Sequence, residues 1–419
     1  MLLRIWVRFT LTSLLVGGFV TASAAEPAFL DPAQKTADFS TFCQFVEEEY
    51  AYFDVKKTDW VGVCKRYALL VPDAVNRDTY VGVLERALGE LYDHHAHLGT
   101  NTLQSYRLVP TQADLFATWA QGRAVILQVR SGSAAQLAGL MAGMEVVQIN
   151  GEATDSVVRS VEPVALSQRD PAARDWALQV ALAGRRHLDT VRLLTRTGDQ
   201  LREIEFSPRY QQTSALLSHR MIANIGYVRL NNSLGQQALV YAFDKALAEM
   251  PLAQALVIDL RDTPSGGNSS VARGIMGRLV ASMQAYQRHE LISEFRATGV
   301  RRIWDEYVVP RDAPFLKPVV VLVGRWTGSM GEGLAIGLNA IRSAPVLGQP
   351  MAHLLGANGE IVLPHSKIVV RIPTEKLFHI NGTPREAFVP KAVAQGQSTH
   401  ISLDSELDAA VEMAQRLSR

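Results

Sequence analysis

The chain has 419 residues, of which 47% are hydrophobic and 20% charged, so it can bury a large core and is not a disordered chain. Its 42 Lys and Arg residues balance 41 Asp and Glu residues for a formal net charge of +1, which argues against nucleic acid as the main partner. The 30 Gly and 18 Pro residues are near average usage and exclude collagen-like and low-complexity classes.

Residues 1–25 are typical of a secretory signal peptide. Arg4 and Arg8 precede an apolar stretch at 9–20, and the small residues at 22–25 offer a cleavage site. A retained membrane anchor is the alternative, but the uncharged run is at the lower edge of what spans a bilayer. We therefore predict a periplasmic or secreted protein with no stable membrane span after cleavage.

Export changes how the two cysteines, Cys43 and Cys64, are interpreted. In an oxidising compartment they can form one disulfide. The spacing alone leaves two separately buried thiols as an equal alternative, because a bridge requires the Cα atoms to lie within about 7 Å of each other.

Three regions follow in chain order. Residues 26–110 are predicted to be helical, with apolar residues at spacings of three and four, a break at Pro72, and a histidine cluster at 92–98. Residues 111–208 are predicted to be a β-rich module with strands at 124–129, 145–149, 191–194 and 201–206 and a short helix at 134–140.

Residues 209–419 are predicted to form an α/β domain. Strands at 226–230, 255–260 and 318–323 alternate with helices at 235–249, 269–280 and 329–342, and an amphipathic helix at 403–417 closes the chain. This alternation predicts a mainly parallel sheet covered by helices.

Ser329 is the strongest candidate for a chemical role. It follows the apolar strand at 318–323 across a glycine-rich turn and stands where the next helix begins. The N–H groups and partial positive charge of a helix N-terminus suit an anion that develops beside a nucleophilic serine. The alternative is structural, because Ser329 and Glu332 also have the spacing of a capping box.

A second signal is the loop that follows the strand at 255–260. Gly266 and Gly267 would expose backbone N–H groups in a concave turn, which is what an oxyanion hole requires. A phosphate cradle of the Walker type is excluded because no Gly-Lys-Ser/Thr run is present. A plain turn remains the alternative.

These motifs resemble the C-terminal processing (tail-specific) serine proteases and the tricorn core protease. The run AQALVIDLRDTPSGGNSS is similar to the family's Asp-Leu-Arg and double-glycine loop, and residues 318–342 are similar to its serine turn and helix. The segment at 132–151 is similar to the carboxylate-binding loop, helix and hairpin of the family's PDZ domain. The resemblance implies a crotonase-like (ClpP/crotonase) α/β catalytic domain with a PDZ-like module that binds peptide through Gly132, Ser133 and Ala134.

The resemblance also implies roles for individual residues. One branch of the family uses a lysine about two dozen residues after the serine, but the first lysine after Ser329 is Lys367. The tricorn-like branch uses an early histidine and a late glutamate, which places these roles on His95 and Glu386. That pattern has a serine before its histidine, whereas this chain has His94. The oxyanion would be held by the N–H of Met330 together with that of Gly266 or Gly267.

The function predicted is that of an exported serine endopeptidase that cleaves proteins or peptides without a cofactor. Two alternatives are a non-catalytic peptide- or lipid-binding protein on the same fold, and an α/β-hydrolase esterase that would need His379 or His400 after its serine. A zinc site at His95 and His97 lacks an evident third ligand, so no metal is expected. The sequence leaves the substrate and the oligomeric state open.

Overall fold

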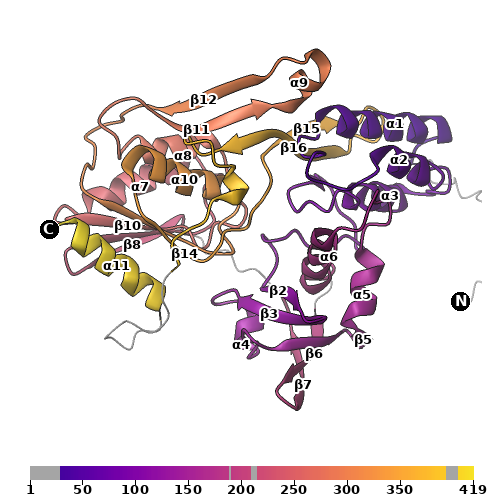
Figure 1. Cartoon of the computed structure of the whole chain (residues 1–419), viewed down its shortest axis with the longest axis horizontal. Coiled ribbons are helices and arrows are strands. Elements are labelled where there is room, and N and C mark those ends of the chain that lie inside the picture. Colours follow the sequence, from indigo (N-terminus) through magenta and orange to yellow (C-terminus); the bar gives the residue numbers. More distant parts are fainter. Residues whose placement is uncertain (1–28, 188–189, 209–214, 393–403) are drawn as a thin grey trace, which may run out of the picture.

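The computed structural model describes residues 29–187, 190–208, 215–392 and 404–419 (Figure 1). The signal peptide predicted at 1–25 lies outside these residues. Of the helices in the described ranges, none has the length and apolar character needed to span a bilayer.

The N-terminal region consists of three helices, α1 (Pro32–Glu49), α2 (Trp60–Ala68) and α3 (Arg77–Gly89). The first begins at Asp31, whose carboxylate accepts the N–H of Gln34 in a capping box. Cys43 in α1 and Cys64 in α2 form a disulfide, with their Cα atoms 6.0 Å apart. The structure thus contains the bridge that the spacing had left open.

These helices share their core with strands from late in the chain. Leu363, Val370 and Ile372 pack with the buried faces of α1 to α3. The strand β16 (Val369–Phe378) lies between β1 (His97–Leu98) and β11 (Gln284–Leu291), and β15 (Ala357–Val362) also pairs with it. β12 (Arg302–Val308) completes this sheet, and α9 (Ile292–Thr298) connects β11 to β12. The histidine cluster is therefore brought beside residues 355–378.

The middle module is an antiparallel sheet with helices packed on it. Its strand order is β2 (Leu115–Ala120), β3 (Arg123–Val129), β4 (Glu145–Ile149), β6 (Val191–Thr197) and β7 (Gln200–Phe206), with β5 (Glu152–Ala153) beside β4. Its helices are α4 (Ala134–Leu137), α5 (Thr154–Val161) and α6 (Pro171–Ala183). The four predicted strands are present, but α4 is shorter than predicted because the chain turns at Gly139, where φ is 91°.

The third region contains the predicted parallel sheet. Its strand order is β14 (Val346–Gly348), β13 (Val319–Val323), β10 (Ala255–Asp259), β9 (Ile225–Leu230) and β8 (Leu217–Ile222), of which only β8 runs antiparallel to its neighbour. β10 and β13 are apolar in nearly every position because both faces of the sheet are covered. The mixed α/β class that we predicted is confirmed.

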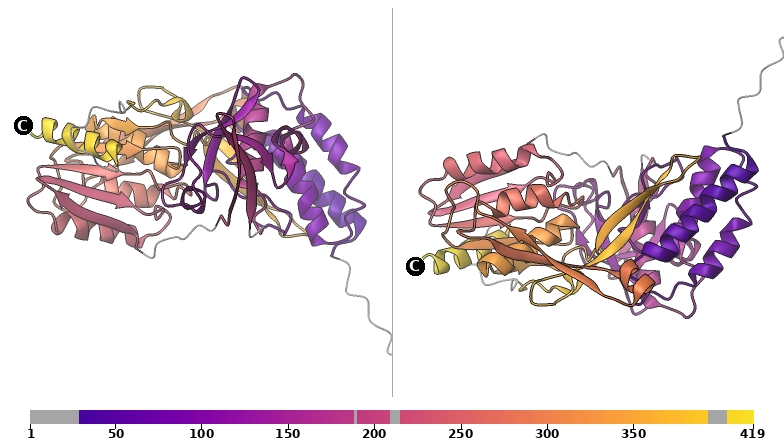
Figure 2. Two further views of the ribbon diagram at one scale, coloured as in Figure 1. Left: turned by 90° about the horizontal axis from the view of Figure 1, so that it is seen from below. Right: turned by 90° about the horizontal axis from the view of Figure 1, so that it is seen from above.

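Alternate residues of each strand pack on opposite sides of this sheet. One set packs under α7 (Ala238–Ala248), α8 (Ser269–Met276) and α10 (Met330–Arg342), and the other under α11 (Ser405–Leu417). A short 3-10 helix, η1 (Arg385–Ala387), follows β16. Figure 2 shows from two sides that the N-terminal helices and α11 lie at opposite ends of the molecule.

Candidate active site

The candidate site lies where β10 and β13 end. These parallel neighbours place the turns that follow them at the same edge of the sheet, where ligands usually bind in such folds. The two turns are joined by hydrogen bonds: Thr327 donates from Oγ1 to the Leu260 carbonyl (2.8 Å), and the N–H of Thr263 donates to the Trp326 carbonyl (3.0 Å). The double-glycine loop and the serine turn are therefore one unit.

Ser329 has a backbone conformation that serine rarely adopts, with φ 52° and ψ −117°. Strain of this kind costs about 1–3 kcal/mol and is concentrated at functional sites. The Ser329 N–H donates to Glu332 Oε2 at 2.9 Å, as a capping box requires. Its Oγ lies 3.1 Å from His95 Nε2, across 234 residues of sequence. The same residue thus begins the helix and faces an imidazole.

His95 is held from two directions. Its backbone N–H donates to Asp93 Oδ1 (2.9 Å), and its Nδ1 lies 2.6 Å from the carbonyl oxygen of Leu355. Because a carbonyl only accepts, Nδ1 carries the proton and Nε2 is left to accept from the Ser329 hydroxyl. Burial, with the nearby Arg385 and His97, lowers the pKa of His95 to about 3, so the ring is neutral at physiological pH.

The two glycines of the loop differ in what they offer. A Cβ atom at Gly266 would lie 2.4 Å from the Cβ of Ser329, so this position must be glycine for the serine to fit. The Gly266 N–H already donates to the Thr263 carbonyl (3.1 Å). Within the described residues, the N–H groups of Gly267 and Met330 have no hydrogen-bond partner, so they are the donors open to a ligand.

Glu386 lies near the site but does not contact His95. Its backbone carbonyl accepts from Nδ1 of His353, and Oε2 is buried without a hydrogen-bond partner. Burial raises the pKa of its carboxyl group, while Arg385 and Tyr52 are among the neighbours that oppose this rise. Nδ1 of His95, which a carboxylate would contact if Glu386 oriented the ring directly, contacts the Leu355 carbonyl.

Arg385 supports the site and was not predicted to do so, and Glu332 was predicted only as the partner of Ser329 in a capping box. Arg385 is 2% exposed and donates from one guanidinium nitrogen to the carbonyls of Leu354 (2.9 Å) and Gly356 (2.7 Å). The carbonyl between them, on Leu355, is the one that orients His95. The only sequence signal for Arg385 was its place beside Glu386 in the segment that resembles the family.

Glu332 is fully buried, and its carboxylate accepts hydrogen bonds from backbone N–H groups on both sides of the site. Besides the Ser329 N–H, its carboxylate accepts the N–H groups of His353 (2.9 Å) and Leu354 (3.2 Å). Burial raises its pKa to about 7, and Arg385 and the three donors oppose this rise. The serine turn and the Leu354–Gly356 segment are thus tied to the same carboxylate.

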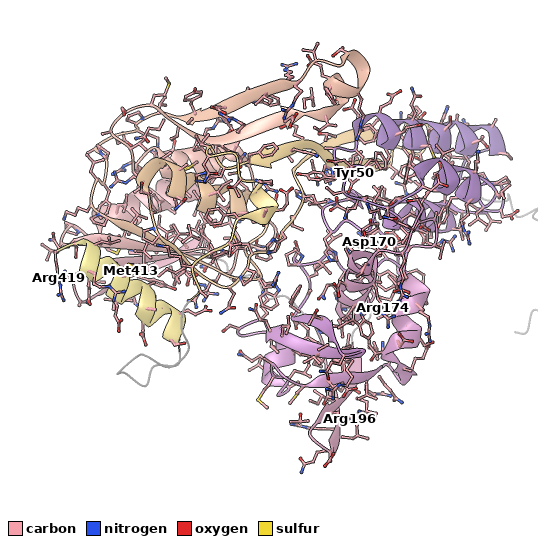
Figure 3. The ribbon with its side chains drawn as sticks, in the orientation of Figure 1. Tyr50, Asp170, Arg174, Arg196, Met413 and Arg419 are labelled. Atoms are coloured by element: carbon pink, nitrogen blue, oxygen red, sulfur yellow. A yellow bond between two sulfur atoms is a disulfide. The ribbon has the colours of Figure 1, made fainter. Side chains whose placement is uncertain are left out.

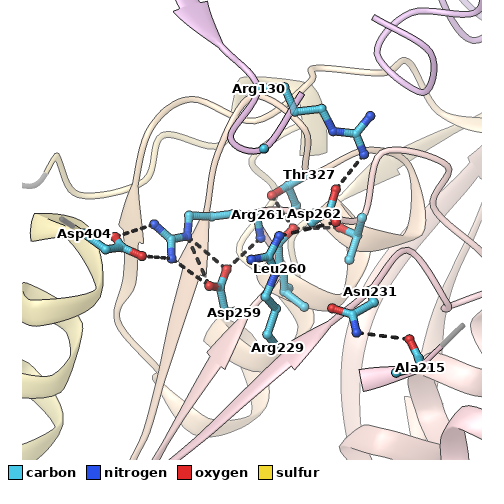
Figure 4. A network of polar contacts seen from close by, with 12 residues as sticks. Arg130, Ala215, Arg229, Asn231, Asp259, Leu260, Arg261, Asp262, Thr327 and Asp404 are labelled. Atoms are coloured by element: carbon cyan, nitrogen blue, oxygen red, sulfur yellow. Dashed lines mark hydrogen bonds and ion pairs between the residues drawn. The ribbon is translucent and has the colours of Figure 1, made fainter. Parts of the chain in front are cut away.

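The double-glycine loop is also held by the middle module. Figure 4 shows Arg130, after β3, reaching Asp262 at the start of the loop, with 2.6 Å between Arg130 Nη2 and Asp262 Oδ1. Arg229 lies on the other carboxylate oxygen (3.4 Å). Trp326 donates from its indole N–H to the Ala113 carbonyl (2.7 Å). Both turns of the site therefore contact the module.

The predicted peptide-binding residues Gly132, Ser133 and Ala134 lie on the loop that leads into α4. The Gly132 N–H donates to Gln136 Oε1 (2.7 Å), and the Ser133 N–H donates to the Arg130 carbonyl (3.1 Å). A carboxylate that binds these N–H groups would have to replace bonds within the loop. The loop is directly connected to Arg130 and, through it, to Asp262.

His94 and His97 point away from the serine. The His94 ring stacks on Trp176 of α6, with 6.0 Å between ring centroids, and His97 Nδ1 lies 3.0 Å from the carbonyl of His95. Over the described ranges, no cluster of three or more His, Cys, Asp or Glu side chains is arranged to hold a metal ion.

Fold and site together place a serine and a histidine in contact at the edge of a parallel sheet. Residues 224–389 match the model of peptidase family S41, and residues 31–89 match that of the tricorn protease C1 domain. The domain that holds Ser329 therefore belongs to peptidase family S41, and the protein is a serine-type peptidase. The resemblance stated from the sequence is confirmed.

Solved structures share the fold of this chain. Mature CPAF complexed with lactacystin has 13% identity and a TM-score of 0.58, and the match covers 92% of this chain and 98% of that one. A photosystem II D1 C-terminal processing protease has 16% identity, a TM-score of 0.57 and coverage of 92% and 97%. A putative peptidase from Parabacteroides merdae has 17% identity, a TM-score of 0.53 and the same coverage. A sequence comparison with curated proteins finds no match.

Proposed function

We propose that the protein is an exported serine endopeptidase in which Ser329 is the nucleophile and His95 the general base. The observation that supports this best is the 3.1 Å contact between Ser329 Oγ and His95 Nε2. These two side chains lie far apart in sequence but are in contact in the structure. The imidazole of His95 also has the tautomer that can accept a proton from the serine. Neutral imidazole beside a hydroxyl is the arrangement that activates a serine.

In the reaction, the Ser329 oxygen attacks the peptide carbonyl while its proton passes to Nε2 of His95. The N–H groups of Gly267 and Met330 hold the oxyanion that forms. The C–N bond then breaks as Nε2 returns the proton to the leaving amine. Water, deprotonated by the same nitrogen, cleaves the acyl-enzyme and releases the second product.

The test is the reaction of the purified protein with a fluorophosphonate probe, followed by mass-spectrometric mapping of the labelled residue. We expect the label on Ser329, complete loss of labelling in Ser329→Ala, and a loss of at least 100-fold in His95→Ala. Ser218→Ala, on the edge strand β8, is the control and should label normally. An unlabelled protein, or His95→Ala that labels at the wild-type rate, would refute the mechanism.

The two alternative functions make different predictions. A binding protein on the same fold would not react with the probe at all. An esterase of the α/β-hydrolase type would need a histidine after its serine. His379 is 7% exposed, accepts the Asn381 N–H (3.1 Å) and stacks on Phe388, so it is not presented to Ser329. His400, the other candidate, lies outside the described residues.

We further propose that the middle module is a PDZ-like unit that captures the C-terminus of a protein substrate at Gly132–Ala134. The support is the route from this loop through Arg130 to Asp262 at the oxyanion loop. If capture at the loop is coupled to catalysis, Arg130→Gln should remove the stimulation of cleavage by a free C-terminus. Arg192→Gln, an exposed change on β6, should leave it intact. Equal stimulation in both variants would contradict the coupling.

Export to the periplasm or the extracellular space is the third element of the proposal. The Cys43–Cys64 disulfide supports it, because such bridges form and persist in oxidising compartments. The test is mass spectrometry of the protein recovered from its cells. The expected result is a mature chain that begins near residue 25 and has both thiols oxidised; an intact N-terminus in a reducing compartment would overturn it.

A further inference from the structure

A cavity of about 770 Å³ lies on the other side of the segment that carries His95. It is bounded by α3, by residues 100–109, and by α5 and α6 of the middle module. His94 and His97 line it, whereas Ser329 does not. Its size is that of a site for a small molecule or short peptide.

Two buried or partly buried carboxylates of this cavity, Glu90 and Glu85, already have partners. Glu90 accepts the Tyr67 hydroxyl (2.8 Å) and the N–H groups of Val164 and Ala165. Glu85 accepts the Ser105 hydroxyl (2.6 Å). These carboxylates stabilise the walls of the cavity and have no need of a ligand.

Arg186 also lines the cavity, but its side chain is not paired as the carboxylates are. Its side chain is half-buried, its Nε is buried without a hydrogen-bond partner, and over the described ranges its guanidinium forms no hydrogen bond or ion pair. Glu85 acts on it only from a distance, and burial lowers its pKa. An unpaired, partly desolvated guanidinium is a binding group for a carboxylate. Apolar side chains line the same cavity, among them Leu88, Val109 and Trp176.

The cavity and His95, the proposed general base, are connected through the backbone segment that carries His94, His95 and His97. His97 Nδ1 and the side-chain amide of Asn358 both lie on the carbonyl of His95, at 3.0 and 2.9 Å. Figure 3 labels Tyr50 and Asp170, which hold the preceding residues: Tyr50 donates to Asp93 (2.8 Å), and Asp170 accepts from Tyr92 (2.7 Å). A ligand against His97 would therefore act on a segment that Tyr50, Asp170 and Asn358 also contact.

We propose that this cavity is a regulatory site for an apolar carboxylate, which binds Arg186 through its acid group and changes the reactivity of Ser329 by displacing His95. The regulatory part of this inference depends on the function proposed above, whereas the binding part does not. Two sources share the ligand chemistry: a fatty acid, and a short apolar peptide with a free C-terminus such as a peptidase releases.

Binding is measured by calorimetry on Ser329→Ala, which removes catalysis from the result. The probes are decanoate and N-acetyl-Leu-Ala-Ala, with decanamide and the peptide amide as uncharged controls. We expect at least one acid to bind saturably, its amide to bind at least 10-fold more weakly, and Arg186→Gln to weaken the acid at least 10-fold. Arg202→Gln, on β7, is the matched control and should bind as before.

The outcomes separate the possibilities. Binding of decanoate alone would assign the site to fatty acids, and binding of the peptide alone to peptide ends. Binding that Arg186→Gln leaves unchanged, equal binding of acid and amide, or no binding of either acid would overturn the site. The regulatory part is tested with active protein: fluorophosphonate labelling of Ser329 must change at least threefold at saturation, and an unchanged rate would refute it.

Discussion

Replacing Arg385 tests whether His95 is positioned by a backbone carbonyl. The guanidinium donates to Leu354 and Gly356, on both sides of the Leu355 carbonyl that holds the imidazole. Hydrogen bonds from a charged donor are worth about 1.5–3 kcal/mol each, so Arg385→Met should lower the free energy of unfolding by about 3 kcal/mol or more. A shift of about 1 Å in a reacting group costs about 100-fold in rate, which is the loss we expect in labelling.

Two further variants separate positioning from stability. Arg385→Lys keeps the charge but offers a single donor atom on a flexible stem, so its labelling rate should fall between those of wild type and Arg385→Met. Arg342 also donates to two carbonyls, those of Leu316 (2.6 Å) and Lys317 (3.0 Å), but at the far end of α10. Arg342→Met should therefore lose stability and keep its labelling rate.

The assay is the second-order rate constant for fluorophosphonate labelling, measured at a temperature where thermal unfolding shows each variant to be folded. Labelling is a suitable readout because a purely structural role would change the melting temperature without changing the reactivity of the folded fraction. A folded Arg385→Met that labels as fast as wild type would refute the positioning role. So would an equal loss of rate in Arg342→Met.

Two other changes probe the groups around the serine. Gly266→Ala places a Cβ 2.4 Å from the Cβ of Ser329 and should abolish labelling. Gly299→Ala, at a similar positive φ but with open space around it, should cost some stability and no reactivity. Equal labelling of the two variants would show that the contact is unimportant. Glu386→Gln should lower the labelling rate less than 10-fold, far less than His95→Ala, because no hydrogen bond joins Glu386 to His95. A loss as large as that of His95→Ala would show that the Glu386 carboxylate acts directly on the imidazole.

Much of the catalytic domain could be predicted because its signals are local. The parallel strands are short apolar runs, and Ser329 and the double glycine stand in turns directly after two of them. Neighbouring parallel strands end at one edge, so pattern alone brings the serine turn and the glycine loop together. His95 came from the resemblance to the protease family, since nothing in its own neighbourhood distinguishes it from His94 or His97.

What could not be predicted depends on backbone atoms and on packing between distant segments. The acceptor at Nδ1 of His95 is the main-chain oxygen of Leu355. Because every residue has a main-chain carbonyl, the sequence contains no signal for which one takes this position. The sequence does not determine which of the two glycines donates its N–H within the turn; in the structure it is Gly266, to the Thr263 carbonyl. The disulfide depended on how α1 and α2 pack, which a spacing in sequence does not determine.

The site separates two tasks that a single carboxylate performs in many serine hydrolases, namely to orient the histidine and to stabilise its positive charge. The Leu355 carbonyl orients His95 fully, because it fixes the same tautomer, but it carries no net charge. The fixed cation nearby, Arg385, disfavours imidazolium and acts with burial to lower the pKa of the ring. In the mechanism that we propose, the charge that stabilises imidazolium arises during the reaction, when the oxyanion forms beside Gly267 and Met330. Under this mechanism His95 is held in place at rest and becomes effective as a base only in the transition state, which is where stabilisation increases the rate.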